Sequence, residues 1–170
     1  MIQVYTGNGK GKTTAALGLI IRMIGVGNKV CLIQFLKKGR YSEIKAIKKY
    51  FGSSVELFQF GNKNFVFKGK IKEQDKKEAQ KGLKKTAEIL ASNRYDLVVL
   101  DEINAAAYFG LIKKKEVLNL LQKWRKKTEI VLTGRYAPKE FIKIADLVTE
   151  MKEIKHPYRQ GKKARKGIDY

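Results

Sequence analysis

TGNGKGKTT, residues 6–14, separates a short segment, Ile2–Tyr5, from a longer apolar one, Ala15–Ile21. The first segment has the length of a strand, and the second has the composition of a buried helix. Glycines permit backbone torsions with positive φ and let successive N–H groups point at phosphate oxygens, while a helix N-terminus favours negative charge. The stretch therefore predicts a strand, a phosphate-binding turn and a helix.

Two side chains of this loop have direct chemical roles in such a site. Lys12 would reach the terminal phosphates, and the Thr13 hydroxyl would ligate Mg²⁺. The general phosphate-loop pattern places its first glycine at the position of Thr6, so Gly7 lies one position late. A tight turn that merely contains lysines is the alternative interpretation.

Apolar, β-branched runs alternate with helical patterns along the chain, which predicts repeated βαβ units. The expected strands are Ile2–Tyr5, Lys29–Phe35, Val55–Phe58, Leu97–Leu100, Glu129–Leu132 and Leu147–Met151. The expected helices are Lys12–Gly25, Ser42–Tyr50, Glu73–Asn93, Lys113–Lys126 and Pro138–Ala145. We expect an α/β fold with a mainly parallel β-sheet flanked by helices, P-loop NTPase-like (RecA-like), in one domain over residues 1–170.

Periodicity within these elements predicts which residues form the core. Leu97–Leu100 is apolar at every position, as in a strand covered on both faces, and we place it at the centre of the sheet. In the helix at 113–126, Val117, Leu118, Leu121 and Trp124 recur at three- and four-residue intervals and predict a core face. Opposite charges three or four apart predict a solvated face for the helix at 73–93.

Two further elements end at the edge of the sheet where open α/β sheets bind ligands. Asp101 and Glu102 follow the central strand, and one or both carboxylates can hold Mg²⁺ directly or through water. A helix N-cap is the alternative interpretation of this pair. Arg135 follows another strand, where we expect a bidentate phosphate contact rather than a plain surface position.

Composition excludes several classes of protein. The chain has 170 residues, with 37 Lys plus Arg against 16 Asp plus Glu, and a formal charge of +21. One cysteine, Cys31, excludes an intramolecular disulfide and a four-thiolate zinc site, and one histidine, His156, excludes a His-rich metal centre. The sequence shows no signal-peptide pattern and no apolar run long enough to span a membrane, so we expect a cytoplasmic protein.

A nucleotide site does not name a reaction. The missing thiolates exclude the zinc site of a thymidine-kinase-like enzyme. A small nucleotide-dependent ATPase that binds nucleic acid stays open on charge, although the chain leaves little room for a second recognition domain. A non-catalytic nucleotide-binding regulator is a third alternative.

GNGKGKTTAA at 7–16, VVLDE at 98–102, TGR at 133–135 and HPYRQGKKARKGIDY at 156–170 together resemble the ATP:corrinoid adenosyltransferases. That family adenosylates cob(I)alamin and cob(I)yrinic acid a,c-diamide. The similarity covers almost the whole chain in order. GNGKGK and the ending with Gly161, Ala164 and Gly167–Tyr170 are specific to the family rather than to phosphate loops in general.

The resemblance implies that a Co(I) corrinoid attacks the 5′ carbon of ATP and that the whole triphosphate leaves. Such chemistry needs orientation and charge stabilisation rather than a protein base. Lys12 and Arg135 would stabilise the leaving charge, Thr13 with Glu102 and Asp101 would hold Mg²⁺, and Arg22 matches a family arginine near the nucleotide. The residues implied to bind the triphosphate are Gly7, Asn8, Gly9, Lys10, Gly11, Lys12, Thr13 and Thr14.

The family also has an aromatic-x-aromatic element that faces the corrinoid and helps displace its lower axial base. Phe65 and Phe67 stand in that place, although their spacing alone predicts a short buried strand. Family members commonly carry an N-terminal extension that caps the active site, whereas this chain starts at its first expected strand. Either the closed site is built differently, or a partner in a homodimer and the tail at 152–170 supply the cover. We expect His156 to orient the tail or to act structurally.

Our leading hypothesis is adenosyl transfer from ATP, with Mg²⁺, to a cobalamin or corrinoid precursor, in adenosylcobalamin biosynthesis or salvage. The basic tail, with Lys152, Lys155, Arg159, Lys162, Lys163, Arg165 and Lys166, would attract an acidic flavodoxin-like reductant. Lysine richness is equally consistent with a hot habitat. Nucleic acid is the less favoured partner, and the sequence does not choose between complete cobalamin and a precursor as acceptor.

Overall fold

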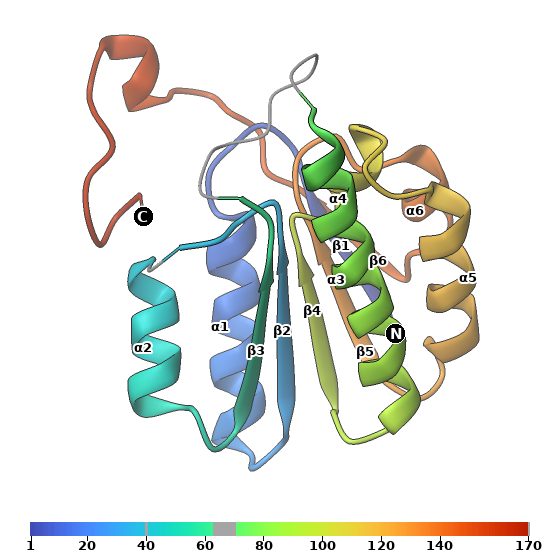
Figure 1. Ribbon diagram of the computed structural model, residues 1–170. Coiled ribbons are helices and arrows are strands. Elements are labelled where there is room, and N and C mark those ends of the chain that lie inside the picture. Colours follow the sequence, from blue (N-terminus) through green and yellow to red (C-terminus); the bar gives the residue numbers. More distant parts are fainter. Residues whose placement is uncertain (40, 63–70, 170) are drawn as a thin grey trace.

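The computed structural model describes residues 1–39, 41–62 and 71–169 and contains one six-stranded sheet (Figure 1). Its strands are β1 (Ile2–Thr6), β2 (Val30–Phe35), β3 (Val55–Phe60), β4 (Leu97–Asp101), β5 (Glu129–Thr133) and β6 (Leu147–Glu150). Their order is β3-β2-β4-β5-β1-β6, and every pair is parallel. The parallel sheet and the central position of β4 confirm the prediction.

Helices cover both faces of the sheet (Figure 1). They are α1 (Lys12–Gly25), α2 (Ser42–Tyr50), α3 (Glu73–Ser92), α4 (Ile103–Tyr108), α5 (Lys114–Trp124), α6 (Lys139–Ile144) and a 3₁₀ turn, η1 (Pro157–Gln160). None of the helices that the structure describes is long and apolar enough to cross a membrane.

Two apolar cores lie on opposite sides of the sheet because side chains alternate along each strand. Val98 and Leu100 of β4 belong to the core shared with α3, α4, α5 and α6, whereas Leu97 and Val99 belong to the core shared with α1 and α2. All residues of β2 and β4 are buried. The only cysteine of the chain, Cys31, is fully buried in the first of these cores. This arrangement explains the continuous apolar run at 97–100.

The helix faces agree with the sequence pattern. Val117 and Leu121 of α5 are buried, and Leu118 and Trp124 pack against the same core while half-buried. Helix α3 carries three ion pairs three residues apart: Lys76–Glu73 and Lys85–Glu88 on its exposed face, and Lys81–Glu78, in which Glu78 is buried.

The observed boundaries differ from the predicted ones at the carboxyl ends of the strands. β1, β4 and β5 continue through Thr6, Asp101 and Thr133, which the apolar pattern left out. Each of these residues is polar yet buried, so its backbone extends the strand while its side chain enters the polar edge of the sheet. Helix α4, directly after β4, was not predicted, because six residues are too few to show a helical period.

The loops that follow β1, β4 and β5 meet at this carboxyl edge, and the tail that follows β6 runs across the same end of the molecule (Figure 1). The Gly9 N–H donates to the Met151 carbonyl at 2.7 Å, which ties the loop after β1 to the beginning of the tail.

Candidate functional site

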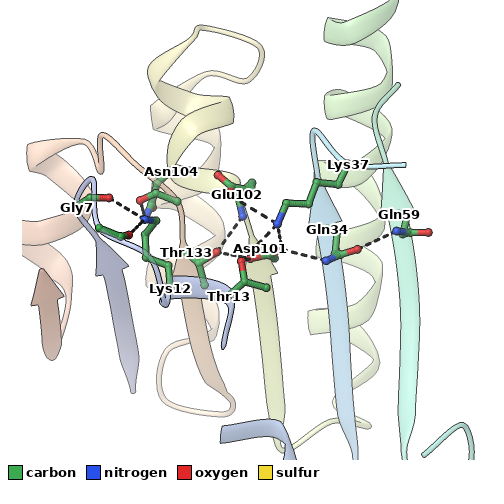
Figure 2. Close-up of polar contacts among 12 residues, drawn as sticks. Gly7, Lys12, Thr13, Gln34, Lys37, Gln59, Asp101, Glu102, Asn104 and Thr133 are labelled. Atoms are coloured by element: carbon green, nitrogen blue, oxygen red, sulfur yellow. Dashed lines mark hydrogen bonds and ion pairs between the residues drawn. The ribbon is translucent and has the colours of Figure 1, made fainter. Parts of the chain in front are cut away.

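The loop at 7–11 connects β1 to the N-terminus of α1, as the sequence predicts. Gly7 and Gly11 have φ values of 95° and 119°, a region that side chains with a Cβ rarely adopt. Lys12 is nearly buried, and its ammonium donates to the carbonyls of Gly7 (2.8 Å) and Gly9 (2.6 Å). Lys12 thus lies at the centre of the loop, where an anion bound by the loop would be (Figure 2).

We expect Gly7→Ala to lower the free energy of unfolding by roughly 1–3 kcal/mol and to weaken ATP binding. A Cβ at residue 7 would lie 2.4 Å from the backbone oxygen of Met151, and φ is positive. The matched control is Gly18→Ala, because a Cβ there has no atom within 4 Å and lies inside α1. That change should raise the free energy of unfolding by about 0.5–1 kcal/mol. Urea denaturation measures both, and equal effects would contradict the prediction.

A carboxylate cluster lies beside the loop, at the end of β4 (Figure 2). Asp101 is fully buried, and its carboxylate accepts four hydrogen bonds. The donors are the hydroxyls of Thr13 (2.9 Å) and Thr133 (2.6 Å), the Gln34 amide (3.1 Å) and the Lys37 ammonium (3.0 Å). Burial alone would raise the pKa of Asp101, but the Lys37 charge and these hydrogen bonds outweigh it and hold the pKa below its usual value.

Glu102 differs from Asp101 in conformation and in electrostatics. It has φ 63° and takes the N-cap position of α4 without a capping bond from its side chain, while its N–H donates to the Thr133 hydroxyl. Burial and the neighbouring Asp101 charge raise the pKa of Glu102, against the effects of Lys37, Lys12 and Arg135. Glu102 therefore takes the N-cap position without capping α4 through its side chain, and both carboxylates belong to one polar cluster.

Arg135 directly follows β5 and Gly134 and is exposed. Its charge is close enough to affect two groups of the site: it helps burial to lower the pKa of Lys12, and it counteracts the raised pKa of Glu102. Arg135 thus belongs to the same edge as the loop. Beside it, Tyr136 stacks on Tyr108 of α4 with ring centroids 4.6 Å apart.

Sequence reasoning missed two residues that organise this edge. Lys37 contacts both carboxylates, with 3.0 Å to Asp101 and 3.7 Å to Glu102. Asn104 is buried, and its amide nitrogen donates to the carbonyls of Tyr5 (3.4 Å) and Gly134 (3.3 Å), which joins the ends of β1 and β5. Its amide oxygen is the one buried side-chain polar atom without a partner in the described part of the chain.

Other residues named from the sequence lie elsewhere. Arg22 is exposed in the last turn of α1, ten residues from Lys12, which corresponds to about 15 Å along a helix axis. The structure therefore does not bring Arg22 to the loop within one chain. Asn8 is exposed on the loop, and Thr14 is exposed in the first turn of α1. Phe65 and Phe67 lie outside the described residues.

The tail packs against the loop through Lys10. Its ammonium donates to the Ile168 carbonyl at 2.6 Å and forms an ion pair with Asp169. A cavity of about 320 Å³ lies between loop and tail, and His156 is among its lining residues. The lysine and arginine side chains around it are Lys10, Lys152, Lys155 and Arg165, and the carboxylates are Glu153 and Asp169. The basic character predicted for the tail thus extends over the phosphate loop.

The donors at the end of β4 fit a divalent cation that prefers oxygen ligands. A hydroxyl (Thr13) and two carboxylates (Asp101 and Glu102) converge there, and Mg²⁺ is commonly bound by one or two carboxylates together with substrate phosphates. Within the described ranges, no group of three or more His, Cys, Asp or Glu residues gathers as a metal site of the protein alone. Such a site would depend on oxygens from the nucleotide.

Comparisons with known proteins show which family this chain resembles along its whole length. The family model described as ATP:corrinoid adenosyltransferase BtuR/CobO/CobP matches residues 1–170. A corrinoid adenosyltransferase from Sinorhizobium sp is 38% identical over 100% of this chain and 80% of its own length. One from Pseudomonas aeruginosa is 35% identical over 100% of this chain and 83% of its own.

Among solved structures, the flagellar accessory protein FlaH from Methanocaldococcus jannaschii superposes with a TM-score of 0.58 at 15% identity. The match covers 88% of this chain and 69% of that protein. At this identity the likeness concerns the fold alone, and it confirms the P-loop NTPase-like (RecA-like) prediction.

Proposed function

The chain belongs to the ATP:corrinoid adenosyltransferase family, and from this membership we propose that it transfers the 5′-deoxyadenosyl group of ATP to the Co(I) of a reduced corrinoid. The reaction would release triphosphate and would serve adenosylcobalamin biosynthesis or salvage. The observation that carries this proposal is the meeting of the loop around Lys12 with the carboxylates of Asp101 and Glu102 at one edge of the sheet.

The reaction is a displacement at the 5′ carbon. The electron pair of Co(I) forms the Co–C bond while the C5′–O bond breaks, and the triphosphate leaves with that bond's electrons. Cobalt itself is the nucleophile, so no side chain has to remove a proton. The protein's part is to hold the triphosphate and to stabilise the charge that grows on it.

The residues at the edge suit these tasks. The loop N–H groups and Lys12 would bind the triphosphate, and the Arg135 guanidinium would add a second positive charge. Thr13, Asp101 and Glu102 would hold Mg²⁺, which neutralises part of the triphosphate charge when it is bound. Lys10 on the same loop would add a further positive charge, although its ammonium contacts Ile168 and Asp169 of the tail in this structure.

Product analysis tests this function. Purified protein with ATP, Mg²⁺ and chemically reduced cobalamin should yield inorganic triphosphate and a light-sensitive adenosylcorrinoid, measured by ion chromatography and visible absorbance. An incomplete corrinoid precursor serves as a second acceptor. ADP and orthophosphate without adenosylated corrinoid would instead support the ATPase alternative.

We expect the double change Phe65→Ala and Phe67→Ala to slow a reaction that starts from Co(II) more than one that starts from preformed Co(I). The reason is that these rings are proposed to displace the lower axial base, which makes Co(II) easier to reduce. Stopped-flow absorbance with both starting states measures the difference. Equal losses in both assays would contradict the role in axial-base removal.

The tail and the basic surface lead to a further expectation. We propose that the segment 152–170 covers the active site and that the enzyme works as a homodimer.

We also propose that an acidic cytoplasmic electron carrier of the flavodoxin kind docks on the basic surface. Turnover coupled to such a carrier should fall steeply between about 50 and 300 mM salt because the Debye length shortens. Turnover with chemically reduced corrinoid is the control and should change little.

A further inference from the structure

Lys37 enters the site from a constrained position at the end of β2. The preceding Leu36 has φ 60°, an uncommon conformation for a residue with a Cβ, and the Leu36–Lys37 backbone packs against Gly61 after β3, where a Cβ would lie 2.7 Å from the Lys37 nitrogen. From there the Lys37 side chain reaches across to the end of β4. The Lys37 side chain is only 19% exposed. The backbone and the contacts with the carboxylate cluster therefore fix the position of the Lys37 side chain.

Three oxygens surround the Lys37 ammonium (Figure 2). They are Asp101 Oδ2 at 3.0 Å, Thr13 Oγ1 at 3.4 Å and Glu102 Oε1 at 3.7 Å. The same three side chains are the ones proposed above to hold Mg²⁺. The ammonium thus lies among the oxygens that a divalent cation would use.

We propose that Lys37 is an exchangeable counter-ion of the metal site: its ammonium and the divalent cation compete for the same three oxygens, so that the cation binds tightly only together with the triphosphate. This inference rests on the proposed function, because it concerns the metal site of that reaction. Lys37 acts on the cation through Thr13, Asp101 and Glu102, and is therefore a positioning residue.

Formal charges support the competition. Asp101 and Glu102 carry two negative charges when ionised, and Lys37 neutralises one of them. A divalent cation added beside Lys37 would leave a net positive charge in a nearly buried site, which is unfavourable. The triphosphate supplies several negative charges, so it both attracts the divalent cation and gives the displaced ammonium a new partner.

The contacts also indicate which partner moves. Asp101 is fixed by the hydroxyls of Thr13 and Thr133 and by Gln34, and Gln34 in turn accepts a hydrogen bond from Gln59 at 2.9 Å. The Lys37 ammonium, by contrast, is at the end of a long, flexible side chain in the segment after β2. Exchange is therefore expected to displace the lysine and to leave the carboxylates in place.

A purely structural ion pair would explain the same distances. Both interpretations predict that removal of the Lys37 charge destabilises the protein, so stability does not separate them. Only the competition predicts that the divalent cation then binds more tightly in the absence of nucleotide.

The test measures Mn²⁺ as a probe of the Mg²⁺ site by electron paramagnetic resonance of free Mn²⁺, without nucleotide. Lys37→Met should bind Mn²⁺ at least about tenfold more tightly than the wild type. Lys38→Met is the matched control, because it removes the same charge from the exposed neighbouring residue and should change the dissociation constant less than about twofold. Lys37→Arg keeps the charge and should bind Mn²⁺ as weakly as the wild type.

Three outcomes are decisive. No tightening in Lys37→Met, or equal tightening in Lys38→Met, would overturn the competition. If Lys37→Met does not fold, Lys37→Gln takes its place, because its amide still donates to Asp101 without the charge. If the wild-type protein fails to bind Mn²⁺ even with ATP, the proposed metal site itself is rejected. If the wild type binds Mn²⁺ with ATP, but neither Lys37→Met nor Lys37→Gln binds it more tightly without nucleotide, only the role of Lys37 is rejected.

Discussion

Lys12→Ala should lower kcat/KM for adenosyl transfer by about 10²–10³-fold or more while the protein remains folded. The Lys12 ammonium lies inside the loop, on the carbonyls of Gly7 and Gly9, so its loss removes the central positive charge from the proposed triphosphate site. Because both partners are loop carbonyls and not core groups, the sheet and helices should keep their stability. Steady-state kinetics and thermal melting measure the two effects.

The control for Lys12 is Lys126→Ala, an exposed lysine between α5 and β5, at the amino end of the sheet and thus opposite its carboxyl edge. It removes the same formal charge and should leave kcat/KM unchanged within about twofold. Unchanged turnover in Lys12→Ala would remove the phosphate-loop argument, whereas a large loss in both variants would point to a general effect of net charge.

Asp101→Asn should lower the free energy of unfolding by about 2–4 kcal/mol and abolish Mg²⁺-dependent ATP binding. Asparagine replaces one carboxylate oxygen by an NH₂ group, which cannot accept the hydrogen bonds that Asp101 accepts in the wild type. The substitution also leaves the Lys37 ammonium without its closest counter-ion. Since Asp101 is fully buried, water cannot compensate for these losses. Urea denaturation and calorimetric ATP titration check the prediction.

The matched control is Asp96→Asn, the same substitution next to the opposite end of β4. Asp96 is exposed and accepts a hydrogen bond from the Lys29 N–H, which an asparagine oxygen also accepts. Its effect on the free energy of unfolding should stay within about 0.5 kcal/mol. Similar stability of both variants would show that the cluster around Asp101 contributes little to the fold.

The sequence was sufficient for the architecture because the signals that define it are local. The alternation of strand and helix patterns and the glycine loop each occupy a short window, and β1–α1 matches its prediction closely. The apolar pattern ended one residue early at Thr6, Asp101 and Thr133. Hydrophobicity does not mark a strand residue that is buried among polar partners, and two of these residues, Asp101 and Thr133, belong to the cluster at the end of β4.

At the site, the sequence did not predict electrostatic contacts between residues that lie far apart in the chain. Lys37 is one of many basic residues in the chain, and nothing in its immediate sequence separates it from its neighbour Lys38. The available signal was topological: β2 and β4 are adjacent parallel strands, so a residue just beyond β2 meets Asp101. For Arg22 the resemblance implied a place near the nucleotide. Arg22 lies in the last turn of α1, a helix of 14 residues, so most of the helix length separates it from the loop.

The buried thiol of Cys31 has a practical consequence for experiments on this enzyme. Burial raises the pKa of Cys31 to about 12, and the side chain has no exposed surface. Maleimide and iodoacetamide reagents attack thiolates, so at neutral pH the native cysteine should stay unreacted while the fold is intact. A second cysteine, introduced in the tail, can then carry a fluorophore or spin label while the native Cys31 is kept.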